Sequence, residues 1–129
     1  MNPPYITLFF AGLCALIQVV LTALVIARRI QARVDLLDGG DKTLLRRIRA
    51  HGNFAETTPM ALLLLALLEI GGLPTLGLWL FGGGLLLGRV LHAIGLLARG
   101  ARWARISGML LTLTVLSTQG MSCLWLFLR

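Results

Sequence analysis

Four long apolar stretches restrict the folds open to this chain of 129 residues. They cover residues 5–27, 54–70, 75–97 and 106–128. A helix needs about 20 mainly apolar residues to cross a bilayer, so each stretch is close to the required length. Only 13% of the residues are charged, whereas a soluble domain carries about 25%. The sequence therefore predicts an all-α integral membrane protein, in which residues 1–129 form a single four-helix bundle.

Basic residues gather in two of the three connections between these stretches. The first connection holds Arg28, Arg29, Arg33, Lys42, Arg46, Arg47 and Arg49, and the third holds Arg99, Arg102 and Arg105. The second connection, residues 71–74, is a tight turn without a charge. Because basic loops stay in the cytoplasm, this pattern predicts that both termini are periplasmic. The net charge of +7 follows from this alternation, and a nucleic-acid partner is not expected.

The remaining features of the first and last apolar stretches fit a structural role. Residues 1–5 contain no basic residue and no clear cleavage site follows, so the first apolar stretch is expected to stay as a helix. Gln18, the one strongly polar side chain in this stretch, is expected to form a helix–helix hydrogen bond. Cys14 and Cys123 lie in apolar stretches. We interpret them as small buried residues, neither disulfide partners nor metal ligands.

Local signals define the second and third helices. Asp41 or Thr43 is expected to cap a second helix that begins near Thr43, projects from the membrane and continues through the apolar stretch. Pro59 removes one backbone donor and is expected to kink this helix. Glycines at 82–84 and 88 allow the third helix to approach a neighbour closely.

One face of the second helix carries polar groups into the membrane. Arg46, Arg49, Asn53 and Glu56 are spaced by three, four and three residues, so they share a face. Long basic side chains near span ends reach toward headgroups. This explanation fits several of the arginines without any function: Arg33, Arg47, Arg99 and Arg102. It does not fit Asn53 and Glu56, because a carboxylate inside the membrane needs a cation.

We interpret these residues, with others at the same predicted depth, as an anion site at the cytoplasmic boundary. The candidates are Arg28, Arg29, Arg49, Asn53, Glu56, Arg89, His92 and Arg105. Arginines would hold carboxylates in bidentate pairs, Glu56 would bind an ammonium, and a cationic pocket would favour a thiolate. The alternative is a structural network in which Glu56 pairs with Arg89 or Arg49.

The motifs also resemble a known family. Arg49-Ala50-His51-Gly52-Asn53-Phe54-Ala55-Glu56-Thr57-Thr58-Pro59 is similar to the R-A-x-x-N-x-x-E-x-x-P signature of the MAPEG family, the membrane-associated proteins in eicosanoid and glutathione metabolism. Gly88-Arg89-Val90-Leu91-His92 resembles a third-helix stretch of eukaryotic members, and Ala27-Arg28-Arg29 resembles the end of a first helix. The resemblance covers nearly the whole chain and is strongest to short bacterial inner-membrane members.

This resemblance implies a homotrimer with glutathione as co-substrate between subunits. It implies that glutathione is bound by Arg28, Arg49, Asn53, Glu56, Arg89 and His92. It also implies two catalytic residues, with Arg105 stabilising the thiolate and Arg29 donating a proton near the acceptor. The implied activity is that of a glutathione transferase or peroxidase acting on lipophilic substrates from the bilayer. The chain departs from relatives at Leu96, where eukaryotic members have a tyrosine, and at Gly52, where some have an arginine.

Two other functional classes are alternatives to this activity. A non-catalytic scaffold or lipid-binding protein would explain the arginines but leaves the pairing of Asn53 with Glu56 unexplained. A small-molecule exporter would normally place a titratable carboxylate on a central pathway, and the first span has none.

Overall fold

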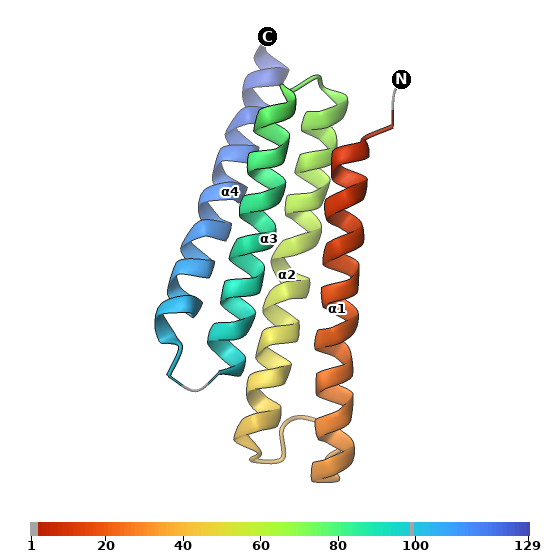
Figure 1. Cartoon of the computed structure of the whole chain (residues 1–129), viewed down its shortest axis with the longest axis vertical. Coiled ribbons are helices and arrows are strands. Elements are labelled where there is room, and N and C mark those ends of the chain that lie inside the picture. The colour runs from red at the N-terminus through yellow and green to blue at the C-terminus, as the bar shows by residue number, and fades with distance from the viewer. Residues whose placement is uncertain (1–2, 99) are drawn as a thin grey trace.

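Four long α-helices form the computed structural model, which describes residues 3–98 and 100–129 (Figure 1). Helix α1 covers Tyr5–Ala32, α2 Lys42–Ile70, α3 Thr75–Leu97 and α4 Arg102–Leu128. Each helix is long and apolar enough to cross a membrane. The prediction of an all-α integral membrane protein with four spans is therefore confirmed.

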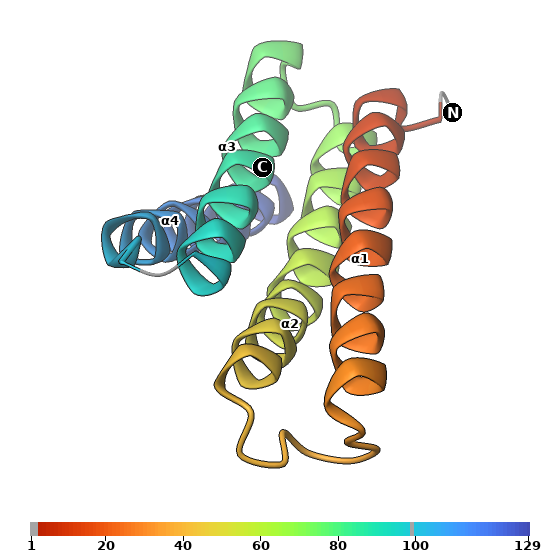
Figure 2. The same cartoon turned by 60° about the horizontal axis from the view of Figure 1, so that its bottom comes forward.

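The helices run alternately up and down, so the two basic connections lie at one end of the bundle (Figure 1). The uncharged turn between α2 and α3 lies at the other end. Helices α1 and α4 occupy opposite edges, with α2 and α3 between them (Figures 1 and 2). The apolar window of each edge helix is only 17% buried, compared with 28% for α2 and 33% for α3. The edge helices therefore expose most of their hydrocarbon surface, as a membrane protein does to lipid or to a neighbouring subunit.

Asp41 organises the connection between α1 and α2. Its carboxylate accepts a hydrogen bond from the backbone N–H of Leu44 at 2.7 Å, which confirms it as the N-cap of α2. The same carboxylate pairs with Arg28, with Nη2 and Oδ2 2.6 Å apart. The Arg28 hydrogen bond, followed by the Leu44 N–H, holds the pKa of Asp41 below its usual range. Asp41 thus holds the last turns of α1 through Arg28 and also caps the first turn of α2.

At the opposite end of the bundle, Glu69 near the end of α2 caps the start of α1. Its carboxylate accepts hydrogen bonds from the backbone N–H groups of Ile6 and Thr7, each at 2.8 Å. The hydroxyl of Thr7 donates a third, at 2.7 Å. These contacts satisfy two of the first N–H groups of α1, which have no partner within their own helix. Pro4, the N-cap residue of α1, has no polar side-chain atom that could accept hydrogen bonds from these N–H groups.

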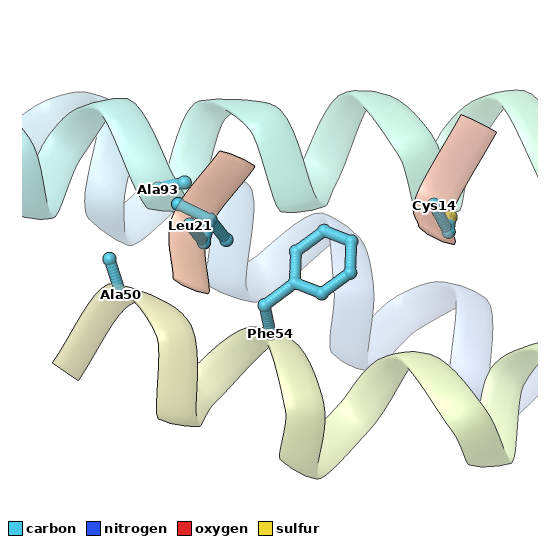
Figure 3. Packing of buried hydrophobic residues seen from close by; sticks show 5 residues of the cluster. All are labelled: Cys14, Leu21, Ala50, Phe54 and Ala93. Carbon is cyan, nitrogen blue, oxygen red and sulfur yellow. The ribbon is translucent and has the colours of Figure 1, made fainter. Parts of the chain in front are cut away.

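Helices α1 and α2 also meet inside the bundle. The predicted helix–helix hydrogen bond of Gln18 is confirmed, since its Nε2 lies 2.7 Å from Nε2 of His51 on α2. Nearby, Phe54 of α2 points into a cluster with Cys14 and Leu21 of α1, and Ala93 of α3 closes the cluster (Figure 3). Helix α2 continues through Pro59 without a break. Cys14 is buried, as predicted, whereas Cys123 is only half-buried; both are free thiols.

Glycines bring α3 and α4 into backbone contact. A β-carbon at Gly88 would lie 2.7 Å from Oγ1 of Thr112 and 3.1 Å from the carbonyl oxygen of Gly108. A β-carbon at Gly108 would lie 2.5 Å from the backbone nitrogen of His92. A β-carbon at Gly95 would likewise clash with the backbone of Arg105. The predicted close approach is confirmed at Gly82, Gly84 and Gly88 but not at Gly83, which faces open space. The crossing at Gly88 and Gly95 fixes the first turns of α4 against the end of α3.

Candidate functional site

The polar face of α2 is exposed along the bundle. Arg49 and Glu56 are exposed and Asn53 is half-buried. Asn53 Nδ2 donates to the backbone carbonyl of Arg49 at 2.9 Å, which leaves its side-chain oxygen available. Among the described residues, neither Arg49 nor Glu56 forms an ion pair. These three residues therefore present one cation, one amide and one carboxylate that the protomer itself does not neutralise.

Arg89 lies behind this face, between α2 and α4. Its side chain is only 1% exposed. Nε donates to Oγ1 of Thr112 at 3.0 Å. Nη1 donates to Oγ1 of Thr57 at 3.0 Å and to the carbonyl oxygen of Asn53 at 3.2 Å. Nη2 has no partner within residues 3–98 and 100–129. Arg89 is thus a buried cation held by neutral oxygens.

These contacts contradict the alternative in which Glu56 forms a structural network with Arg89 or Arg49. The only ion pair formed among the described residues joins Arg28 to Asp41. Glu56 pairs there with neither Arg89 nor Arg49, because Arg89 is turned toward the threonines of α2 and α4. That alternative was therefore wrong for the protomer. Thr57 and Thr112 are the partners that the sequence reasoning missed.

His92 lies one turn along α3 and contacts the start of α4. Its Nδ1 is 2.9 Å from the backbone carbonyl oxygen of Arg105. A carbonyl oxygen only accepts, so Nδ1 carries a proton, and the neutral ring leaves Nε2 as an acceptor. That Nε2 is buried and has no hydrogen-bond partner among the described residues. Buried polar atoms are usually paired, so Nη2 of Arg89 and Nε2 of His92 are unusual in being free.

Arg28 and Arg29 are engaged by the protomer itself. Arg28 holds Asp41 with two nitrogens, at 2.6 and 3.3 Å. Nη1 of Arg29 donates to the carbonyl oxygens of Asp35 and Leu37, at 3.1 and 2.9 Å. Both arginines therefore stabilise the connection after α1. None of these bonds joins either arginine to Arg89 or His92.

Arg105 lines a cavity together with two arginines that the sequence analysis left outside the site. This cavity of about 210 Å³ is lined by Arg46 of α2, the end of α3, and Arg102 and Arg105 of α4. Leu96, one of the departures from the family pattern, lines it as well. Arg46 could have been added from the sequence, because it lies one turn before Arg49 on the same face. Arg102 gave no such signal.

A separate apolar groove runs between α1 and α2. It has a volume of about 400 Å³ and is lined mainly by small and apolar side chains, together with Gln18 and Thr58. The hydroxyl of Thr58 and Oε1 of Gln18 are buried and have no partner among the described residues. Because α4 does not line this groove, Arg105 does not adjoin it within one protomer.

Comparison with known proteins assigns the family. The MAPEG family model matches residues 7–125. The chain belongs to the MAPEG family. The matched part includes every residue of the predicted site, from Arg28 to Arg105, so the earlier resemblance is confirmed.

Two relatives of this MAPEG protein are bacterial membrane proteins. The chain is 36% identical over 120 residues to inner membrane protein YecN of Escherichia coli strain K12, covering 93% of this chain and 91% of that protein. The YecN protein of Escherichia coli O6:H1 strain CFT073 matches to the same extent. No solved structure matches the chain.

The second departure from the family pattern, Gly52, leaves open space beside the polar face. A β-carbon at this position would meet only Oε1 of Glu56, at 3.9 Å, which is an ordinary van der Waals contact. The structure therefore gives no steric reason for glycine here. Its absence of a side chain leaves the carboxylate of Glu56 uncovered.

Proposed function

We propose that this MAPEG protein binds glutathione and uses it as a glutathione transferase or peroxidase toward lipophilic electrophiles. The observation that carries the proposal is the exposed carboxylate of Glu56, which lies on the same helix face as Arg49 and Asn53 and has no ion-pair partner among the described residues. Glutathione carries one ammonium and two carboxylates. An isolated carboxylate beside guanidinium groups matches that charge pattern.

In the proposed complex each polar group has one task. Glu56 accepts hydrogen bonds from the ammonium, and Arg49 binds a carboxylate. Asn53 and the free Nε2 of His92 bind peptide groups of the tripeptide, and the free Nη2 of Arg89 donates to a further oxygen. Arg28 adds a contact from the end of α1, where it also holds Asp41.

The chemical step is addition of the glutathione sulfur to an electrophilic carbon. The guanidinium of Arg105 stabilises the thiolate, whose pKa in free thiols is about 8.5. The thiolate supplies the electron pair of the new carbon–sulfur bond, and Arg29 supplies a proton to the acceptor. In the peroxidase reaction the thiolate attacks a peroxide oxygen instead, so the O–O bond breaks, the alcohol leaves with a proton and the sulfur becomes a sulfenic acid. A second glutathione then attacks this sulfur, which gives glutathione disulfide and water.

A homotrimer would complete this site. The polar face of α2 is exposed in one chain, which is costly at membrane depth unless a neighbour covers it. Arg105 lies on α4, at the edge opposite α1 (Figure 1), so it does not adjoin the groove between α1 and α2. An adjacent subunit can bring a second α4 to this groove, and a lipophilic acceptor would then enter from the bilayer.

Arg105→Ala tests the proposed chemistry. Glutathione should bind the purified protein in mild detergent, with three chains per particle in native mass spectrometry. The thiolate absorbance in the ultraviolet, followed against pH, gives the pKa of the bound thiol. We expect Arg105→Ala to raise this pKa and to lower the conjugation rate, with a smaller effect on binding.

Three results would count against the proposal. An unchanged thiol pKa in Arg105→Ala would remove Arg105 from the mechanism. Glutathione binding without any thiolate in the unmodified protein would favour a scaffold or binding role. A monomer that still binds glutathione would exclude a site between subunits.

We further propose that the basic end of the bundle is cytoplasmic and both termini are periplasmic. The arginine-rich connections lie together at one end (Figure 1), as the distribution of basic loops requires. A cysteine introduced in place of Asp38 should then react with a membrane-impermeant maleimide only after the cells are opened. Labelling of intact cells, after permeabilisation of the outer membrane alone, would reverse the assigned orientation.

A further inference from the structure

The cavity at the basic end of the bundle has a charge pattern unlike that of the α2 face. Three of its lining residues are arginines, Arg46, Arg102 and Arg105, and the other described lining residues are glycine, alanine and leucine. Among the described residues that line it, none is acidic. Three like charges around one cavity repel each other unless an anion lies between them.

In the part of the chain that the structure describes, these three guanidinium groups have no hydrogen-bond or ion-pair partner. Three other arginines at this end do have one, although the side chains of Arg33 and Arg49 also lack a partner among the described residues. Arg28 pairs with Asp41, Arg29 binds two loop carbonyls, and Arg47 donates to the carbonyl of Leu24 at 2.7 Å. The cavity therefore collects guanidinium groups whose donors remain available for a ligand.

The size and chemistry of the cavity point to a phosphate group. A volume of about 210 Å³ corresponds to about seven waters at 30 Å³ each, enough for a phosphate and part of its hydration shell. Guanidinium groups bind phosphate oxygens in bidentate pairs. Glutathione is a poorer match, because its ammonium would meet three cations and no described carboxylate.

The position of the cavity indicates where such a phosphate would come from. Trp103, next to Arg102, is 69% exposed, and tryptophan is enriched at the headgroup level of membrane helices. Basic pockets between transmembrane helices on the cytoplasmic side bind anionic headgroups. We propose that this cavity binds the phosphate of an anionic membrane lipid, held by Arg46 from α2 and Arg102 from α4.

Native mass spectrometry of the delipidated full-length protein tests this proposal. Both lipids carry the phosphate, but only phosphatidylcholine carries an ammonium, which the arginines repel. Attraction of two basic side chains to a net anionic lipid is worth about tenfold in affinity, so phosphatidylglycerol should be retained about tenfold better than phosphatidylcholine. The double variant Arg46→Gln/Arg102→Gln should lose this preference. Arg46→Lys/Arg102→Lys, which keeps both charges, should retain part of it.

A matched control separates the site from general charge. Lys42→Gln/Arg129→Gln removes the same net charge outside the cavity and should bind phosphatidylglycerol as the unmodified protein does. Equal loss in both double variants would overturn the proposal, as would retention in Arg46→Gln/Arg102→Gln. Size-exclusion profiles and circular dichroism report whether each variant is folded.

Two competition arms identify the source of the anion. Millimolar glycerol phosphate that displaces the lipid would show that the headgroup alone is recognised, whereas its failure would show that the acyl chains contribute. Both results support a phosphate site. Displacement by glutathione at equal concentration would instead assign the cavity to the glutathione site and overturn the proposal.

Discussion

Replacing Gly95 by alanine is expected to separate α4 from α3 and to lower the stability of the protein. A β-carbon at this position would lie 2.2 Å from the backbone nitrogen of Arg105 and 2.6 Å from its Cα. Because these are backbone atoms, a side-chain rotation cannot relieve the clash. Overpacking usually costs about 1–3 kcal/mol, and we expect a loss near the upper end.

Gly83→Ala is the matched control for this change. Gly83 also lies within α3, but a β-carbon there would meet no described atom within 4 Å. Alanine favours the helix over glycine by about 1 kcal/mol, so Gly83→Ala should be neutral or stabilising. Thermal unfolding in detergent compares the two variants directly. Equal stability would show that α3 and α4 can move apart at no cost.

The Gly95 variant should also affect the site. The hydrogen bond from His92 to the carbonyl of Arg105 depends on this close approach. Moving α4 outward would free the imidazole and shift the start of α4 together with its arginines. We therefore expect weaker glutathione binding in Gly95→Ala than in Gly83→Ala, even at temperatures where both are folded.

Glu56→Gln is expected to weaken glutathione binding by more than tenfold while leaving the fold intact. The carboxylate is the proposed partner of the glutathione ammonium, and removing one member of a hydrogen-bonded charge pair typically costs about 2–5 kcal/mol. The side chain is exposed in the protomer and forms no ion pair with a described residue. Its neutralisation therefore removes no described contact within the chain. Isothermal titration calorimetry in detergent measures the affinity.

Glu69→Gln is a control on the same helix, because it should change the stability of the protein and not the binding of glutathione. Glu69 caps α1 through two N–H groups and one hydroxyl, and losing a cap costs about 1 kcal/mol. This variant should be less stable but should bind glutathione normally. A Glu56→Gln protein that binds as tightly as the original would exclude Glu56 as the ammonium partner.

Local patterns in the sequence were sufficient to predict the helices and several contacts. Apolar length predicted the four spans, and the residue types predicted a cap at Asp41 or Thr43, of which Asp41 forms it. The polarity of Gln18 within an apolar stretch predicted a helix–helix hydrogen bond, which His51 completes. These predictions depend on neighbours a few residues apart or on the general need to pair polar groups in lipid.

The contacts that sequence could not provide join distant positions. Glu69 meets Ile6 and Thr7 across more than 60 residues, and no spacing rule connects them. Arg28 was assigned to a ligand, but its distance to Asp41 depends on the path of the connecting loop, including Leu37 at a positive φ of 56°. Whether Arg28 also reaches glutathione remains a prediction.

The cap formed by Glu69 has a consequence for how the chain is inserted. A carboxylate at membrane depth normally recruits a lysine or arginine, and each such residue adds to the signal that retains a segment in the cytoplasm. Glu69 is satisfied instead by main-chain N–H groups and one hydroxyl. With the orientation proposed above, the hairpin turn between α2 and α3 would carry an acid across the membrane without a compensating base. Translocation of that turn is not opposed by positive charge, and the orientation of the whole chain is left to its two basic connections.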